Sequence, residues 1–229
     1  FGVGITDAAL REAARQRNAE RRARLALMEV QQYTPPPISG LGLYKTLEGS
    51  GFLFDQAEKT AGLERLREDV LAAYSAGERP VPPGAKRILV TGCPIGGVLE
   101  KTVGVIEENG GAVVCFENCS GIKAAYQMVD SEAEDIVAAI AARYLEIGCA
   151  VLSPNEKRKE HLKRLVREFQ VDGVVEVDLQ ACATYSIESH GMQELMRGLG
   201  VPYMALETDY SQSDRGQLST RLGAFLERL

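Results

Sequence analysis

The feature that most constrains the fold is a series of short apolar runs that alternate with helix-like segments from residue 87 onward. The runs cover residues 88–90, 113–116, 173–177 and 203–206. Between them, apolar residues recur at the spacing of one helix face. Continuous apolar strands separated by helices indicate a parallel sheet that is covered on both faces. The sequence therefore predicts a doubly wound, flavodoxin-like α/β domain over residues 86–229.

Residues 1–85 are predicted to form a helical linker or packing segment without a strand of its own. Thr6 can cap a long helix from residue 7 to about residue 33, which the Pro35-Pro36-Pro37 run ends. A glycine-rich stretch at residues 40–51 separates this helix from a second one at about 56–74. The chain starts with Phe1 and carries no signal-peptide pattern. We therefore expect it to be the downstream part of a longer polypeptide, with an upstream α/β domain missing.

Six arginines crowd the first helix between Arg11 and Arg24. They could form an anion-binding face. Because the acids Glu12 and Glu20 are interleaved with them, a solvated helix face is the favoured interpretation.

The bulk properties narrow the class of protein. A net charge of −6 and a pI near 5.2 give no reason to expect nucleic acid or an anionic membrane as partner. No apolar run is long enough to span a bilayer. Five cysteines, an odd number without secretory features, argue against a disulfide framework and for a reducing, cytoplasmic setting.

Several motifs have a structural interpretation that is at least as good as a functional one. The loop 92–97 follows a strand but lacks a complete nucleotide-binding pattern, so its glycines are expected to serve a tight turn. His161 lies in a basic helix and is expected to face solvent, whereas His190 could approach the sheet edge and pair with a cysteine. Ser131 is expected to open a helix through a capping box, and Pro154 is expected at the first position of the next helix.

The cysteines are the strongest functional candidates. Cys93, Cys119 and Cys182 each follow a predicted strand, and Cys149 follows Gly148 at a helix end. The carboxyl ends of parallel strands share one edge of a sheet, where ligands bind. A metal or redox site at that edge is therefore one hypothesis, although the spacing matches no C-x-x-C pattern. Core packing is the alternative for each thiol, and it is the preferred interpretation for Cys115, which lies inside its strand.

Three stretches resemble the 2-hydroxyacyl-CoA dehydratase D-component and benzoyl-CoA reductase family. They are Val-Thr-Gly-Cys-Pro-Ile-Gly-Gly from residue 90, Phe-Glu-Asn-Cys-Ser-Gly-Ile-Lys from residue 116, and Val-Asp-Leu-Gln-Ala-Cys-Ala-Thr-Tyr from residue 177. The resemblance covers essentially the whole chain and is greatest to the double-cubane-cluster branch. Dehydratases of the family usually carry Cys-Asp-Pro at the third site, where this chain has Cys182-Ala183-Thr184.

The resemblance implies an iron–sulfur protein that is fed single electrons by an ATP-dependent iron–sulfur activator protein. It implies Cys119, Cys149 and Cys182 as ligands and Cys93 as a weaker fourth. The cluster would be an 8Fe-9S double cubane that reduces small molecules, or a 4Fe-4S cluster in a dehydratase that converts an acyl-CoA thioester to a ketyl radical. We expect a homodimer. Glu117, Asn118 and Gln180 could hydrogen-bond the sulfurs or could simply cap turns.

A different class of function stays open beside the two enzymes. The chain could be a non-catalytic scaffold or a ligand-binding α/β module with buried cysteines.

Overall fold

The protein is described here as a computed structural model that covers residues 2–229. Its helices are α1 (Asp7–Glu29), α2 (Gly40–Gly49), α3 (Gln56–Ser75), α4 (Val105–Glu108), α5 (Ile136–Leu145), α6 (Glu156–Glu168), α7 (Ala183–Leu199) and α8 (Arg215–Leu226). Its strands are β1 (Lys86–Gly92), β2 (Gly111–Glu117), β3 (Gly173–Leu179) and β4 (Tyr203–Thr208). No helix within residues 2–229 is both long and apolar enough to cross a bilayer.

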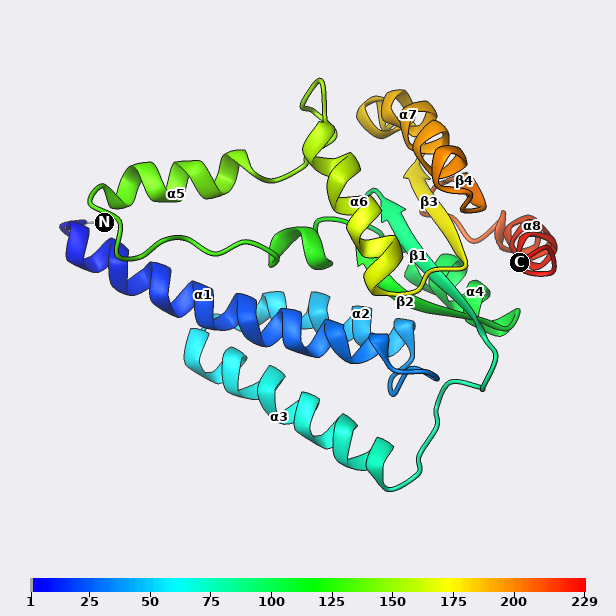
Figure 1. Cartoon of the computed structure of the whole chain (residues 1–229), viewed down its shortest axis with the longest axis horizontal. Helices are drawn as coiled ribbons and strands as arrows, with labels where there is room; N and C mark the ends of the chain where they lie inside the picture. The colour runs from blue at the N-terminus through cyan, green and yellow to red at the C-terminus, as the bar shows by residue number, and fades with distance from the viewer. Residues whose placement is uncertain (1) are drawn as a thin grey trace.

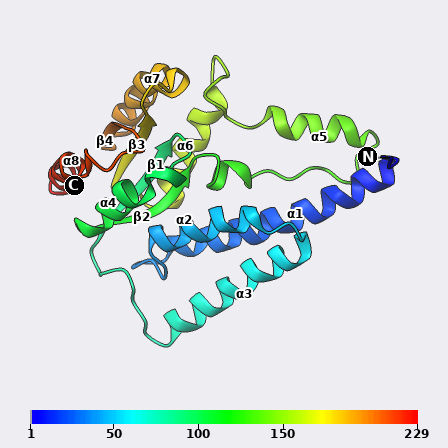
Figure 2. The ribbon, with the colours of Figure 1, turned by 180° about the vertical axis from the view of Figure 1, so that it is seen from behind.

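The four strands form one parallel sheet in the order β2-β1-β3-β4. Helix α6 lies in front of the sheet in Figure 1, and α4 lies in front of it in the reverse view of Figure 2. This arrangement confirms the predicted doubly wound α/β fold. The strand order reverses between β1 and β3, and a ligand of such a sheet binds outside the carboxyl ends at that point.

The strands are apolar in their middle and polar at their carboxyl ends. Ile88, Leu89, Val113 and Val175 are fully buried in the core, as the continuous apolar runs predicted. Thr91, Glu117, Glu176 and Asp178 are also buried, although their side chains are polar or charged. Buried polar groups carry a desolvation cost unless they are paired. Because these buried polar groups gather at the carboxyl edge of the sheet, that edge is the candidate functional site.

Of the N-terminal helices, α2 packs directly on this sheet. The Tyr44 ring of α2 meets the Phe116 ring of β2 edge-on, with the centroids 4.8 Å apart. The glycine-rich stretch that was expected only to separate two helices is itself the helix α2. A Cβ on Gly40 would lie 2.5 Å from the Val113 carbonyl oxygen, so glycine lets α2 approach β2 closely.

Helix α1 begins as predicted, because the Thr6 hydroxyl accepts a hydrogen bond from the Ala9 amide. It ends at Glu29 and continues for one short 3-10 turn, Val30–Gln32. Its arginines do not form one solvated face, however. Arg21 and Arg24 are buried, and Arg24 donates to oxygens of Leu47, Ser50 and Ser120. Helix α1 itself runs between α3 and α5 (Figure 1).

Local signals misplaced several helix starts. Asp135 rather than Ser131 caps α5, through the Ala138 amide. Pro154, which was expected at the first helical position, precedes α6, which begins at Glu156. The crossover between β1 and β2 is divided into a 3-10 turn, a π turn and the short α4.

The burial of His161 is a further correction. It was expected to face solvent, yet it is only 7% exposed and stacks on the Tyr126 ring, with the ring centroids 4.0 Å apart. Its Nε2 has no hydrogen-bond partner. Burial lowers the pKa of His161 to about 4. The fold therefore favours the neutral imidazole.

The depressed pKa of His161 predicts a loss of stability in mild acid. The unfolded chain takes up the proton near pH 6.5 and the folded protein only near pH 4, so this contribution is present above pH 6.5 and is lost as the pH falls toward 4. Between pH 7 and pH 4.5 we expect the wild type to lose about 2–3 kcal/mol more unfolding free energy than His161→Phe. Urea titrations at both pH values measure this. His190→Gln, at the exposed second histidine, should behave as wild type; equal pH dependence in all three proteins would contradict the prediction.

Candidate metal centre

Four thiols lie around the carboxyl edge of the sheet. Cys93 follows β1, Cys119 lies in the turn after β2, and Cys182 stands at the N-terminus of α7, after β3. Cys149 lies in the loop between α5 and α6. The turn that leads to Cys93 needs glycine, because Gly92 has a φ of +101° and a Cβ there would lie 2.3 Å from the Val177 carbonyl oxygen.

Cys93 and Cys182 come together with a carboxylate at the point where the strand order reverses. Their sulfurs and a carboxylate oxygen of Asp178 lie within 4.8 Å of one another. The Cys93 thiol donates to Asp178 Oδ1 at 3.2 Å, and Ser186 Oγ donates to the other carboxylate oxygen at 2.6 Å. Within residues 2–229 this is the one group of three potential ligand atoms so closely spaced. The resemblance ranked Cys93 last among the ligands, yet it lies in this group.

Cys119 and Cys149 lie outside that group but share a neighbour with it. The Tyr185 ring packs in a small cluster with Cys93 and Cys182. Burial raises the pKa of the Tyr185 phenol, and charge on Cys119 and Cys149 raises it further. Tyr185 therefore packs on the close group and lies within electrostatic reach of Cys119 and Cys149.

The thiols of the close group differ in acidity. Burial raises the pKa of Cys93, and the hydrogen bond and charge of Asp178 add to the effect. The Thr184 hydroxyl, 3.5 Å from the Cys182 sulfur, lowers the pKa of Cys182. A metal ion would hold both as thiolates.

This donor set fits a thiophilic group. Two cysteines and one carboxylate lie within reach of one ion, and two more thiols, one of them exposed and one half-buried, lie nearby. Thiolates are the ligands that iron–sulfur clusters require. Cys115, by contrast, is buried inside β2 and its pKa is raised well above the usual value by burial, in agreement with its predicted place in the core.

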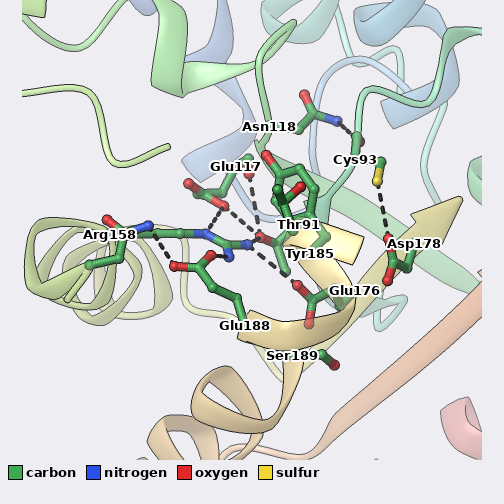
Figure 3. A network of polar contacts seen from close by, with 12 residues as sticks. Thr91, Cys93, Glu117, Asn118, Arg158, Glu176, Asp178, Tyr185, Glu188 and Ser189 are labelled. Atoms are coloured by element: carbon green, nitrogen blue, oxygen red, sulfur yellow. Dashed lines mark hydrogen bonds and ion pairs between the residues drawn. The ribbon is translucent and has the colours of Figure 1, made fainter. Parts of the chain in front are cut away.

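Behind the thiols lies a buried network of charges centred on Arg158 of α6 (Figure 3). Its guanidinium is fully buried and contacts Glu117 at 3.3 Å, Glu176 at 3.4 Å and Glu188. It also donates to the Thr91 hydroxyl at 2.8 Å. The network therefore joins the ends of three strands and α7 through one side chain.

The two buried glutamates differ because their partners differ. Burial opposes ionisation of Glu117, but the charges of Lys123, 2.9 Å away, and Arg158 leave its pKa lowered. Burial dominates at Glu176, whose pKa is raised although Tyr203 and Arg158 bond to it. The network thus holds one firmly ionised carboxylate and one that takes up a proton more easily.

The other predicted site residues have different roles. The Glu117 carboxylate bonds within the charge network, and the Asn118 amide oxygen accepts from the Gly121 amide at 3.0 Å, which favours turn capping. Gln180 and His190 are exposed, and no hydrogen bond joins His190 to a cysteine within residues 2–229. The loop 92–97 packs on α2, where the Ile95 amide donates to the Tyr44 hydroxyl, in agreement with a structural turn.

Three residues of the site were missed from the sequence: Asp178, Arg158 and Tyr185. A signal for Asp178 existed, since Glu176 and Asp178 interrupt an otherwise apolar strand. No comparable signal marks Arg158, because five other basic residues lie between Lys157 and Arg167 of the same helix.

The charge network predicts a large and specific destabilisation on removal of its cation. Arg158→Leu leaves buried carboxylates uncompensated, so it should lower the unfolding free energy at pH 7 by about 3–5 kcal/mol. Arg164→Leu removes an exposed arginine of the same helix and should cost less than about 1 kcal/mol. Urea unfolding measures both. Equal losses of unfolding free energy in the two variants would contradict a stabilising role of the Arg158 network.

The comparisons with known proteins identify the family. The family model of the 2-hydroxyglutaryl-CoA dehydratase D-component matches residues 1–229. The chain is also 47% identical over 230 residues to an Escherichia coli K12 protein named "Putative dehydratase subunit YjiM". The match covers all of this chain and 59% of that relative, so the chain spans less than two thirds of the relative's length. The chain thus belongs to the 2-hydroxyglutaryl-CoA dehydratase D-component family.

Proposed function

We propose that the chain is the C-terminal part of an iron–sulfur reductase and holds its cluster at the carboxyl edge of the sheet. The observation that carries this proposal is the meeting of Cys93, Cys182 and Asp178 where the strand order reverses, with Cys119 and Cys149 nearby. Family membership supports an enzymatic role. The ligands would be Cys93, Cys119, Cys149 and Cys182.

The cluster would supply single low-potential electrons, delivered by an ATP-dependent iron–sulfur activator protein. The protein's own residues would hold it and tune it. Cys93 is 1% exposed, which shields that sulfur from water. The Thr184 hydroxyl bonds the Cys182 sulfur, and such bonds to a ligand shift the reduction potential of a cluster.

The sequence after Cys182 supports a double-cubane cluster that reduces a small molecule, because Ala183-Thr184 stands where dehydratases of the family usually carry Asp-Pro. Thr184, whose hydroxyl lies 3.5 Å from the Cys182 sulfur, stands at the proline position of that motif. The working form is proposed to be a homodimer.

A 2-hydroxyacyl-CoA dehydratase subunit with a 4Fe-4S cluster is the second candidate. The family description and the name of the Escherichia coli relative favour it. In that case the substrate would be an acyl-CoA. A non-catalytic scaffold or ligand-binding module is the alternative from another class, and it requires no iron.

The ligand assignment predicts which cysteine matters for iron. In the full-length protein purified without oxygen, Cys182→Ser should lose most of its iron and acid-labile sulfide, because serine is a poor ligand for iron–sulfur clusters. Cys115→Ser, whose thiol is buried in β2, should keep the wild-type iron content. Colorimetric iron and sulfide assays measure both. Equal iron in the two variants would contradict the assignment.

The iron content of the wild type separates the three candidates. About eight irons per chain would support the double-cubane reductase, and about four would support the dehydratase. Turnover of an acyl-CoA in the presence of the activator would confirm the latter. A protein without iron, even after anaerobic reconstitution, would contradict both enzymes and favour the scaffold.

A further inference from the structure

Two adjoining cavities open beside Cys119, at the side of the sheet covered by α1. Their volumes are about 420 Å³ and 260 Å³. Both are lined by Arg17, Arg21 and Cys119. The larger also reaches Arg24 and Lys59, and the smaller reaches Arg143. Cationic side chains from separate parts of the chain therefore converge on one thiol.

Two of these arginines are buried without a carboxylate partner. Arg21 is 6% exposed, and its one hydrogen bond within the described residues goes to the Asn18 amide oxygen at 3.0 Å. Arg24 is 8% exposed; it donates to oxygens of Leu47, Ser50 and Ser120, and its Nε has no partner. A buried cation without an anion costs free energy, which a bound anion would offset.

The acidic residues of the cavities do not cancel this charge. Glu20 pairs with Arg17 and lies 3.8 Å from Lys59, so its charge is already matched. Glu48 is the other carboxylate of the lining. Arg143 donates to the carbonyl oxygens of Ala124 and Gln127, which carry no net charge. Burial lowers the pKa of Arg21, and the positive charges of Arg143 and Arg17 lower it further.

We propose that these cavities bind an oxyanion, a phosphate or a carboxylate group, through Arg21 and Arg24. A guanidinium presents parallel N–H donors that match two oxygens of either group. Because the cavities lie beside Cys119, the site also indicates the chemistry of the substrate. An anionic group of the substrate would bind the arginines and anchor the substrate beside a cluster held by Cys119. This last step rests on the proposed function, whereas anion binding itself requires no metal.

Isothermal titration calorimetry at low salt tests the site with two probes, pyrophosphate and succinate. We expect at least one to bind the full-length wild-type protein and Arg21→Gln to weaken that binding about tenfold or more. Arg21→Lys keeps the charge and should retain part of the affinity. Arg22→Gln, at the exposed neighbour that lines neither cavity, should bind as wild type. The stronger of the two probes identifies the phosphate or the carboxylate as the preferred group.

Stability and iron content separate a lost site from a damaged fold. Because Arg21 is a buried cation without a carboxylate, Arg21→Gln should unfold at the same or a higher urea concentration than wild type when no anion is present. Its iron content should equal that of wild type, so a failure of the anion site is distinguishable from a failure of the iron proposal. Absence of binding by wild type, or equal affinity in Arg21→Gln and Arg22→Gln, would overturn the inference.

Discussion

The geometry of the thiol edge depends on the burial of one guanidinium. Arg158 binds Thr91 and Glu117, which lie two residues before Cys93 and Cys119 at the ends of β1 and β2. It also binds Glu188 of α7, the helix that begins beside Cys182. A Cβ on Gly148 would lie 2.8 Å from the Arg158 Cβ, so the residue before Cys149 also packs closely on Arg158. Three of the four segments that carry a candidate ligand are therefore bound by the Arg158 guanidinium, and the fourth packs on the same residue.

This arrangement explains why charge is tolerated in the core. Two buried glutamates, Glu117 and Glu176, face two buried cations, Lys123 and Arg158, so the charges within this network offset one another. Buried ion pairs contribute little net stability, but removing one partner costs several kcal/mol of unfolding free energy. Such a network therefore holds the segments that it joins at fixed positions. Ligands of a metal cluster must be held in fixed positions, and supporting bonds of this kind are what hold them.

Sequence reasoning found the parts of the protein that local patterns determine. The four strands, the parallel order and the Thr6 cap follow from apolar runs and capping chemistry, and the cysteines at strand ends follow from topology. It missed features that long-range contacts decide. Gly40 enters a helix because β2 lies against it, and His161 is buried because Tyr126 covers it. Arg158 resembles its exposed neighbours until the fold places three carboxylates around it.

The arginines of α1 show the same limit most clearly, and they bear on the chemistry of the edge. Arg17, Arg21 and Arg24 follow one another at intervals of four and three residues, so they share one face of α1. The interleaved acids suggested that this face was neutralised and solvated, but Glu20 is matched by Arg17 and Lys59. Uncompensated positive charge consequently lies on one side of Cys119, and the Arg158 network lies behind the strands on the other. A cluster held at Cys119 would stand in the positive field of the α1 arginines. Such a field favours the more negative, reduced form of a cluster.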